Sequence, residues 1–356
     1  MVSMQQFFSD EYLPKTIIDR EKEQEAIAGF LRDVLLSRSS RVLYVHGHPG
    51  VGKSTVVKHV LEQFEESNEN SVVAYLSCTS LTPYLCLKEI HSKVCGLQNK
   101  KLTSQEIIPE VVRRLLMKKF ILIVVLDNFD KMQDVEQLLW SFHEMMQKLP
   151  RFGIILVSTS RFELMDMVGE RLYSRLRPEI LEFKPYSSDK LFEIMKSRMI
   201  EAYGKPIADI NALQKIAEFV EENGGSARHA LKILLKAIEE AQSLELTRIT
   251  VEIVDKVLEE EKKNLLLSEL HELKEEAPRE FEVLKVIAEL TAKEENVYTG
   301  LVEKAVKEKG LMVCRRSLEY YLNDLQRRGF VKLSSIRVNK GHSTKIELVI
   351  PGESIL

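Results

Sequence analysis

Residues 41–64 read RVLYVHGHPGVGKSTVVKHVLEQF, an apolar run followed by a glycine-rich turn and a helical pattern. Within this stretch, residues 47–54 complete the signature G-x-x-x-x-G-K-S. Such glycines let the backbone curl so that successive N–H groups face phosphate oxygens, and the dipole of the following helix favours the same negative charge. In this motif the lysine, here Lys53, reaches the β and γ phosphates, and the hydroxyl of Ser54 completes a magnesium shell. The stretch therefore predicts a strand, a phosphate-binding loop and a helix.

Three further apolar runs indicate a parallel sheet around this loop. They read SVVAYLSC (71–78), FILIVVLD (120–127) and GIILVSTS (153–160), and each is followed by a helical pattern. Runs that are apolar without alternation suit strands buried on both faces of a parallel sheet. The second run ends in Asp127, whose carboxylate can hold magnesium through water. We expect an α/β nucleotide-binding base over residues 1–186, with Asp127 as its Walker B residue.

The rest of the chain has a different pattern. Strand signals vanish over residues 187–245, where helical apolar spacing predicts an all-helical lid. A charged helical connector is expected over residues 246–276, ahead of Pro278. Residues 277–356 read as three helices followed by the strands FVKLSSIRV and TKIELVIP around a turn NKGHS. Three helices followed by a hairpin is the order of a winged-helix domain.

This C-terminal part concentrates positive charge, although the whole chain carries a net charge of -3. The segment from Gly310 to Lys345 has eight Lys or Arg residues and two acidic ones, a balance of +6. In its third helix we expect a buried stripe of Leu318, Leu322 and Leu325. The residues then left to face a DNA groove are Arg315, Arg316, Ser317, Tyr320 and Asn323.

The predicted hairpin adds basic side chains that suit phosphates or the minor groove of DNA. These are Arg337, Lys340, His342 and Lys345. The alternative is that the module docks a protein and that its basic residues only form a solvated surface.

Composition excludes several classes of protein. The chain has 356 residues, 44% hydrophobic and 29% charged, which suits two or three globular domains. No run approaches the roughly 18 apolar residues of a membrane helix, and the start, MVSMQQFFSDEYLPK, lacks the pattern of a signal peptide. We therefore expect no membrane partner. The four cysteines show neither C-x-x-C spacing nor nearby histidine pairs, so we expect reduced structural thiols rather than disulfides or a zinc site.

Several segments together resemble the AAA+ family of replication initiators, the archaeal and eukaryotic origin recognition and cell division control proteins. The segments are LPKTIIDREKEQEAI (13–27), LSCTSLTPYLCLKEI (76–90), RLYSRLRPEILEFKPYSSDKLFEIMKSR (171–198), GGSARHALKILLKAIEEA (224–241) and RRSLEYYLNDLQRRGFVKL (315–333). The resemblance covers nearly the entire chain and is more specific in the N-terminal two thirds. It implies an α/β P-loop AAA+ domain with an all-helical lid, followed by a C-terminal winged-helix domain.

The resemblance also implies roles for individual residues. Arg228 matches the sensor-two arginine that contacts the γ-phosphate, and Arg175 matches an arginine finger that reaches a neighbouring protomer's nucleotide. The residues implied to bind the nucleotide are Ile17 and Ile18 beside adenine, Gly50, Val51, Gly52, Lys53, Ser54 and Thr55 at the phosphates, and Tyr186 and Arg198 in the lid region. On the residues alone, Arg228 also suits a solvated helix start, Tyr186 a packed core and Arg175 a surface ion pair.

The chain departs from the family pattern at two catalytic positions. The family's Walker B motif continues Asp-Glu, whereas Asn128 follows Asp127 here; an amide cannot accept the proton of an attacking water. The sensor-one asparagine is replaced by Thr159 or Ser160. We therefore expect an ATP or ADP binder that hydrolyses slowly, with Asp130 as a poorly placed substitute carboxylate.

The family resemblance further implies ATP or ADP with Mg2+ as ligands, and duplex origin DNA, the replicative helicase or related initiator subunits as partners. It places the protein in the cytoplasm of an archaeon or in the nucleus of a eukaryote. A short DNA-touching insertion of the family would fall between Cys95 and Thr103. The alternative function is that of a regulatory or mobile-element ATPase whose winged helix docks protein.

Overall fold

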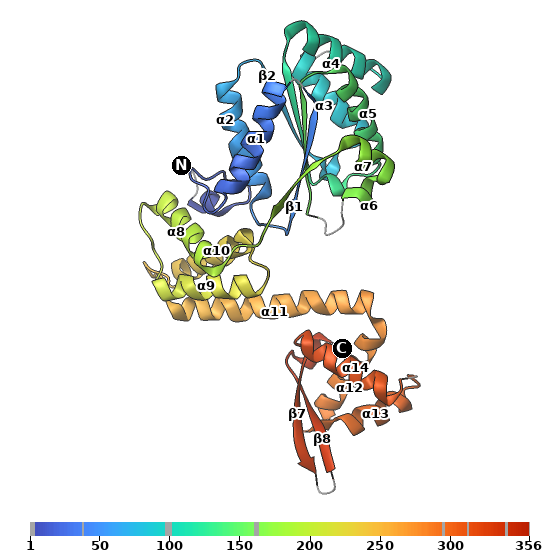
Figure 1. Cartoon of the computed structure of the whole chain (residues 1–356). Helices are drawn as coiled ribbons and strands as arrows, with labels where there is room; N and C mark the ends of the chain where they lie inside the picture. The colour runs from blue at the N-terminus through green and yellow to red at the C-terminus, as the bar shows by residue number, and fades with distance from the viewer. Residues whose placement is uncertain are drawn as a thin grey trace. The chain divides into compact units, whose positions relative to one another are not determined.

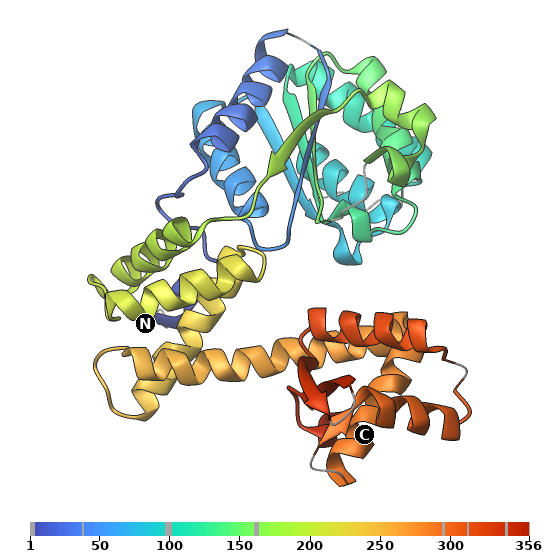
Figure 2. The same ribbon diagram turned by 60° about the horizontal axis from the view of Figure 1, so that its bottom comes forward.

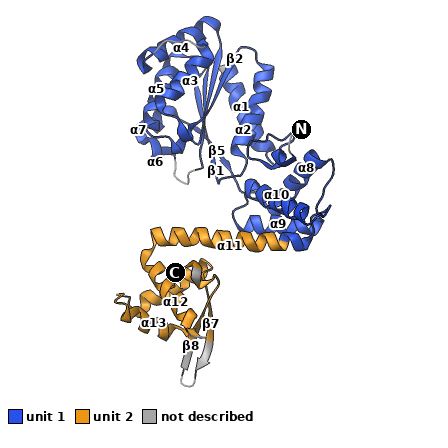
Figure 3. Cartoon of the chain, turned by 180° about the vertical axis from the view of Figure 1, so that it is seen from behind, with its two compact units in different colours: residues 1–254 blue, residues 255–356 orange. Residues whose placement is uncertain are grey.

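The computed structural model describes residues 4–37, 39–96, 102–159, 164–293, 296–311, 313–338 and 341–355. The chain forms two compact units, Met1–Val254 and Asp255–Leu356 (Figure 3). Each unit has its own core, and each is described by itself below. The finer boundaries expected from the sequence remain predictions.

A five-stranded parallel sheet forms the centre of the first unit (Figure 1). The strands are β1 (Arg41–Gly47), β2 (Ser71–Ser77), β3 (Ile121–Asp127), β4 (Phe152–Val157) and β5 (Glu179–Phe183), in the order β2-β3-β4-β1-β5. All four pairings are parallel. Every residue of β3 and β4 is buried, which explains why these segments are apolar without alternation. The carboxyl ends of all five strands lie at one edge, where open α/β sheets bind their ligands.

Helices cover both faces of this sheet (Figures 1 and 2). One face packs against α1 (Glu21–Ser37) and α2 (Lys53–Ser67). The other packs against α3 (Pro83–Cys95), α4 (Ser104–Lys118), α5 (Val135–Lys148), α6 (Leu164–Val168) and α7 (Glu170–Leu176). Alternate residues of β1 point to opposite sides, so that Val42 joins the second core and Leu43 the first. The result is a three-layer α/β sandwich, as predicted.

Strand β5 is absent from the sequence prediction. Its residues, EILEF, interrupt three apolar residues with two glutamates, and only Phe183 is buried. The strand pairs with β1 alone and forms one edge of the sheet. An edge strand of this kind lacks the continuous apolar run that marks the central strands.

Three amphipathic helices follow β5 and form the lid. They are α8 (Ser188–Tyr203), α9 (Ile210–Glu222) and α10 (Ala227–Ser243). Each buries an apolar stripe, such as Ile216 and Val220 on α9. The N-terminal 3-10 helix η1 (Met4–Phe8) packs against α8 and α10, so the beginning of the chain belongs to the lid region. An α/β domain with an all-helical lid is thus confirmed.

The long helix α11 (Val251–Glu276) crosses the division between the units. The second unit continues with α12 (Pro278–Lys293), β6 (Val297–Tyr298), α13 (Thr299–Glu308), α14 (Arg315–Arg327), β7 (Val331–Val338) and β8 (Gly341–Leu348). Its antiparallel sheet has the order β6-β8-β7. The predicted order of three helices and a hairpin is therefore present. As expected, Leu318, Leu322 and Leu325 of α14 are buried in the core of this unit.

The hairpin differs from the prediction in its register. The sequence suggested that the second strand begins at Thr344 and ends at Pro351, whereas β8 begins at Gly341 and ends at Leu348. Val338 pairs with Gly341 and Arg337 with His342, so part of the expected turn lies in the strand. The two-residue strand β6 was also not predicted, because two residues carry no periodicity. None of the described helices has both the length and the apolar character that a membrane crossing requires.

Candidate nucleotide-binding site

The glycine-rich loop lies between β1 and α2, at the carboxyl edge of the sheet (Figure 1). Gly50 and Gly52 have positive φ angles of 77° and 89°, a backbone region that disfavours other residues. A Cβ atom on Gly52 would lie 3.0 Å from the hydroxyl of Tyr186, which comes from the start of the lid region. The loop therefore needs glycine for its conformation and for the close approach of the lid.

Lys53, the first residue of α2, is only 4% exposed. Its Nζ donates hydrogen bonds to the carbonyl oxygens of Gly47 at 2.8 Å and His48 at 2.7 Å. Burial lowers the pKa of Lys53 to about 8, and the charge of Arg228 acts in the same direction, although Asp127 and Asp130 oppose the shift. A buried cation at a helix start is stabilised when an anion binds beside it.

Asp127 lies at the end of β3 with both carboxylate oxygens in hydrogen bonds. Ser54 Oγ donates to Oδ1 at 3.0 Å, and the hydroxyl of Tyr75 donates to Oδ2 at 2.6 Å. Burial raises the pKa of Tyr75, and so does the neighbouring Asp127 carboxylate. Hydroxyl and carboxylate oxygens are the ligands that Mg2+ prefers, so Ser54 and Asp127 fit the predicted magnesium site. Tyr75 was missed because only the pairing of β2 with β3 brings it to Asp127.

A cavity of about 370 Å³ lies between the loop, the N-terminal segment and the lid. It is large enough for a small-molecule ligand of nucleotide size. Most residues predicted to bind nucleotide or to act in catalysis line it. They are Ile17, Ile18, Gly50, Gly52, Lys53, Ser54, Thr55, Asp127, Asn128, Thr159, Tyr186, Arg198 and Arg228.

Two predicted residues lie away from this cavity. Val51 is fully buried, and its carbonyl oxygen accepts a hydrogen bond from Arg20 Nη2 at 3.2 Å. Arg175, on α7, borders a separate cleft and lies over the ring of Trp140, 5.7 Å from its centroid. Arg175 is therefore not part of this chain's own pocket, and its role toward a neighbouring protomer remains a prediction. Ser160 lies outside the described residues.

Two arginines reach the cavity from the lid. Arg198 is 8% exposed, with its guanidinium 4.9 Å from the centroid of the Tyr12 ring. Its Nη1 is buried without a hydrogen-bond partner among the described residues, and burial lowers the pKa of its guanidinium. Arg228, near the start of α10, donates from Nε to Asp10 Oδ1 at 2.8 Å. A buried guanidinium with an unmet N–H suits an anionic or carbonyl-bearing ligand.

Arg20 is a second residue that the sequence reading missed. It is 4% exposed and its Nε donates to the hydroxyl of Tyr186 at 3.1 Å, while the guanidinium stacks on the same ring at 3.9 Å. Its Nη2 donates to the carbonyl oxygens of Val51 and Lys184, at 3.2 and 2.6 Å. Arg20 thus ties the N-terminal segment to the loop and to the start of the lid. A single arginine before a helix gives no motif from which this could be found.

Asn128 lines the cavity directly after Asp127. Its φ angle is 55°, in the left-handed region, which asparagine tolerates better than glutamate does. Asp130 does not line the cavity, and its Oδ1 is buried without a hydrogen-bond partner among the described residues. Of these two residues after Asp127, the one that lines the cavity is thus the neutral amide Asn128 and not the carboxylate Asp130.

In the second unit, the residues predicted to contact DNA lie partly on an exposed face of α14. Arg315, Arg316, Tyr320 and Asn323 are exposed, and Ser317 is partly exposed. Arg337 and His342 lie in paired strands, but their side chains are not described, and Lys340 falls outside the described residues.

Several cations of this unit have acidic partners. Arg315 pairs with Glu319 at 3.4 Å and Lys345 with Glu347 at 2.8 Å. Asp324 pairs with both Arg327 and Arg328. The positive charge available to a ligand is therefore smaller than the count of basic residues suggests. Arg316 forms no ion pair within the part of the chain that the structure describes.

The site defines a class of protein. A phosphate-binding loop after β1, an aspartate at the end of β3 and a helical lid that brings arginines to the cavity are the parts of an AAA+ nucleotide-binding protein. Residues 36–165 match the family model of an AAA domain, and residues 192–259 match that of the Cdc6 AAA+ ATPase-type lid domain. The chain thus contains an AAA domain followed by a lid of the Cdc6 AAA+ ATPase type, and it is similar to ORC1-type DNA replication proteins over most of its length.

Individual relatives agree with this assignment. ORC1-type DNA replication protein 1 of Sulfurisphaera tokodaii is 21% identical over 358 residues, which span 97% of this chain and 89% of that protein. The Aeropyrum pernix ORC1 protein in complex with DNA has a similar fold, with a TM-score of 0.64, 22% identity and coverage of 100% of this chain and 96% of that one. The Aeropyrum pernix ORC2 protein in its ADPNP-ADP complexes also has a TM-score of 0.64 and 22% identity, with coverage of 98% and 95%.

Proposed function

We propose that this protein is a nucleotide-dependent initiator of DNA replication that binds duplex origin DNA through its second unit. The observation that carries the proposal is the exposed face of α14, which presents Arg316, Tyr320 and Asn323 opposite the buried leucine stripe. A helix with one buried face and one basic and polar face suits the major groove. The similar fold of an ORC1 protein in complex with DNA supports the same reading.

ATP or ADP with Mg2+ is the ligand that the cavity fits. The loop N–H groups and Lys53 would hold the phosphates, while Ser54 and Asp127 would hold the magnesium ion. The unmet Nη1 of Arg198 and the exposed guanidinium of Arg228 face the same cavity. A similar fold occurs in a protein with ADPNP and ADP bound. Residues of the lid and of the sheet would both contact the nucleotide. Bound nucleotide would therefore set the angle between the lid and the α/β base, and through it the affinity for DNA.

DNA binding is tested by fluorescence anisotropy, against a random duplex library and then against selected duplexes, with ATP, with ADP and with neither. If about five phosphates are neutralised, log affinity falls with log salt at a slope of about −4 to −5. Arg316→Ala should weaken binding and make that slope shallower by about 1. Lys285→Ala is the control, because Lys285 lies on α12, outside α14, and is paired with Glu282. A flat salt response, or equal effects of the two substitutions, would contradict DNA binding through this face.

Slow hydrolysis is the second part of the proposal. Asn128 replaces the expected glutamate, so the site lacks a carboxylate that accepts the proton of the attacking water. Asn128→Glu should raise ATP turnover by about a hundredfold, the usual lower range for a positioned general base. Asn128→Gln is the control. Glutamine, like glutamate, adopts the left-handed backbone less readily than asparagine does, but it adds no carboxylate. Fast ATP hydrolysis by the unsubstituted protein that is lost in Lys53→Ala would refute the proposal of slow hydrolysis.

The proposed partners are the replicative helicase or related initiator subunits. Arg175 lies outside the chain's own nucleotide cavity and next to Trp140 on the surface of the first unit, where a neighbouring protomer's nucleotide could meet it. Under this proposal the protein acts where chromosomal DNA is, in the cytoplasm of an archaeon or the nucleus of a eukaryote. Cross-linking of the chain to itself or to the helicase, with and without ATP, tests the assembly.

A second candidate function is favoured by the ion pairs of the second unit. Arg315, Lys345 and the pair Arg327 and Arg328 all have carboxylate partners, which suits a mixed-charge surface that docks protein. On this reading the chain is a regulatory or mobile-element ATPase. Absence of DNA binding in every nucleotide state would make it the leading function.

A further inference from the structure

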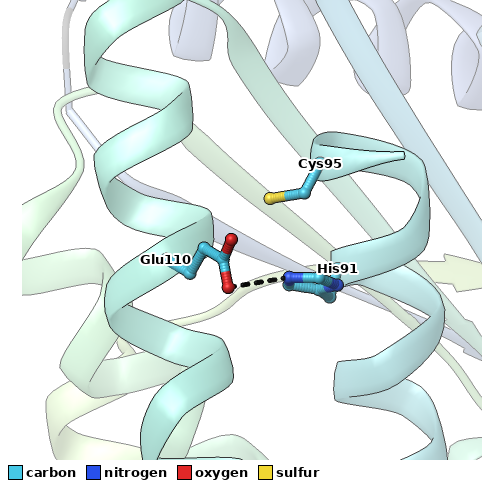
Figure 4. Close-up of side chains that lie close together, drawn as sticks. All are labelled: His91, Cys95 and Glu110. Carbon is cyan, nitrogen blue, oxygen red and sulfur yellow. Dashed lines mark ion pairs between the residues drawn. The ribbon is translucent and has the colours of Figure 1, made fainter. Parts of the chain in front are cut away.

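Three side chains outside the nucleotide site gather between α3 and α4 (Figure 4). His91 and Cys95 lie one turn apart on α3, and Glu110 comes from α4. A spacing of four residues puts two side chains on the same face of a helix. The ligand atoms of the three residues lie within 4.8 Å of one another. Nothing in the proposed function uses this cluster.

The imidazole of His91 is the residue that points to a ligand. It is 5% exposed, and its Nε2 lies 3.2 Å from Glu110 Oε2. The two atoms nevertheless form no hydrogen bond, and Nε2 is buried without such a partner among the described residues. Leaving a buried nitrogen unmet costs free energy, so an additional bonding partner at this position would stabilise the cluster.

The separation of His91 and Glu110 also fits two ligands of one metal ion. Zinc bonds to nitrogen and oxygen are about 2.1 Å long, so two ligand atoms at the corners of a tetrahedral site lie roughly 3.4 Å apart. The separation of 3.2 Å between His91 Nε2 and Glu110 Oε2 is close to that value. In Figure 4 the sulfur of Cys95 and the Glu110 carboxylate lie on the same side of the imidazole.

We propose that His91, Cys95 and Glu110 bind a zinc ion. Imidazole, thiolate and carboxylate are all zinc ligands, and a thiolate selects against magnesium and calcium. One thiolate and one carboxylate also neutralise the two charges of the ion, so binding buries no net charge. Cys95 and Glu110 are both partly exposed, which leaves a way in for the ion and room for a water as fourth ligand.

The ion would fasten the end of α3 to the middle of α4. Cys95 is the last residue of α3, and α4 begins at Ser104. A bond from the last turn of one helix to its neighbour restricts fraying of that turn. This consequence concerns the stability of the first unit and does not depend on DNA binding.

The competing interpretation is an ion pair between a protonated His91 and Glu110 without metal. The sequence spacing indicates neither arrangement, because Glu110 joins the other two residues only through the packing of α3 against α4. The expectation that the cysteines serve only as structural thiols is therefore revised for Cys95 by this proposal.

Cobalt titration of the full chain tests the site. The purified protein is stripped of metal with a chelator under reducing conditions and titrated with Co2+, then with Zn2+. We expect one equivalent of Co2+ to produce a thiolate-to-metal charge-transfer band together with the visible bands of a tetrahedral site, and Zn2+ to abolish both. A Co2+ ion held by Ser54 and Asp127 has only oxygen ligands and gives no such charge-transfer band.

Conservative variants locate the ligands. Cys95→Ser and Glu110→Gln should abolish the band or weaken zinc affinity by on the order of 100-fold, since even residues beyond the ligands cost about 10- to 100-fold. Cys314→Ser, which removes an exposed thiol of the second unit, should leave both unchanged. Far-ultraviolet circular dichroism verifies that each variant is folded. Absence of the band in the parent, survival of the band in Cys95→Ser, or unchanged zinc affinity in Glu110→Gln would overturn the site and leave the ion pair.

Discussion

The hydroxyl of Tyr75 on β2 holds Oδ2 of Asp127 on β3 at 2.6 Å, while Ser54 holds Oδ1 at 3.0 Å. Strands β2 and β3 are neighbours in the sheet, so the orientation of the Walker B carboxylate is fixed from a strand that carries no nucleotide motif. A carboxylate held from both sides is oriented before a metal ion binds it.

Tyr75→Phe tests this arrangement. The variant keeps the ring but loses the hydrogen bond, so the Mg2+ concentration for half-maximal ATP binding should rise about tenfold, as for other partners of metal ligands. The measurement is a magnesium titration at fixed ATP. ADP binding in the presence of a chelator is the control and should not change. An unchanged magnesium requirement would show that Ser54 alone suffices to orient Asp127.

The pair of Asp10 and Arg228 occupies one edge of the cavity. Both side chains are more than half exposed, so the pair is weak. Asp10→Asn frees Arg228 and removes a negative charge near the phosphates, and nucleotide affinity should increase about two- to fivefold. Isothermal titration calorimetry measures the effect, which should shrink at high salt.

The matched control for Asp10 is Glu193→Gln. Glu193 forms an exposed ion pair with Lys196 on α8, away from the cavity. Its substitution should leave nucleotide affinity unchanged. Weaker binding in Asp10→Asn would mean that Asp10 supports the ligand instead of competing with it.

Gly50 is the point where the loop meets the lid. It has a φ angle of 77°, and an added Cβ would overlap Ser226 Oγ and lie 2.9 Å from the Cβ of Arg228. Gly50→Ala should therefore push the lid from the loop and weaken nucleotide binding on the order of tenfold to a hundredfold, the loss that a displacement of about 1 Å produces. Fluorescent-nucleotide titration provides the readout.

Gly204→Ala is the control that distinguishes the effect of backbone strain from the effect of the contact between the loop and the lid. Gly204 has a similar φ angle of 74°, with open space around the position of a Cβ. We expect a loss of stability of about 1 kcal/mol from the left-handed backbone and normal nucleotide binding. If both substitutions weakened binding equally, strain and not the meeting of loop and lid would be the cause.

Glu280 and Asp324 form a buried carboxyl pair between α12 and α14. Burial raises the pKa of Glu280, and the charge of Asp324 raises it further. Burial also acts to raise the pKa of Asp324, but hydrogen bonds from Arg328 and Arg327 outweigh it and hold that pKa below its usual value. A raised pKa in an acid favours the folded state at low pH, and this contribution is lost as pH rises through the folded pKa.

Glu280→Gln should therefore stabilise the second unit at neutral pH, and the gain should shrink toward mildly acidic pH. Hydrogen exchange of the α12 and α14 amides measures it, because the single tryptophan, Trp140, lies in the first unit and does not report on the second. Glu282→Gln, on the exposed face of α12, is the control. A smaller protection of these amides at neutral pH in Glu280→Gln would contradict the assignment.

The sequence predicted the central part of the fold because that part is encoded locally. Strands β3 and β4 are buried throughout and read as continuous apolar runs, and the lid helices show amphipathic spacing. Strand β5 was missed because an edge strand needs only one buried residue, here Phe183. The start of β8 at Gly341 was missed because strand register depends on pairing with β7.

The candidate site likewise has residues that the sequence predicts and residues that only the structure reveals. Lys53, Ser54 and Asp127 follow from a contiguous motif and a strand end. Tyr75 and Arg20 act through contacts with Asp127 and Tyr186, which lie 52 and 166 residues away in the chain. Such contacts leave no periodicity or spacing in the sequence, so they emerge only from the sheet order and the position of the lid.

The nucleotide cavity is assembled from the beginning of the chain, around Ile17, and from α10, around Arg228. During synthesis the phosphate-binding loop therefore leaves the ribosome long before the helix that closes over it. A nascent chain that ends before α10 presents Lys53 and Ser54 without Arg228 opposite them. Stable retention of nucleotide is then a property of a finished first unit, and chains stalled before that point would depend on chaperones to shield the open edge of the sheet.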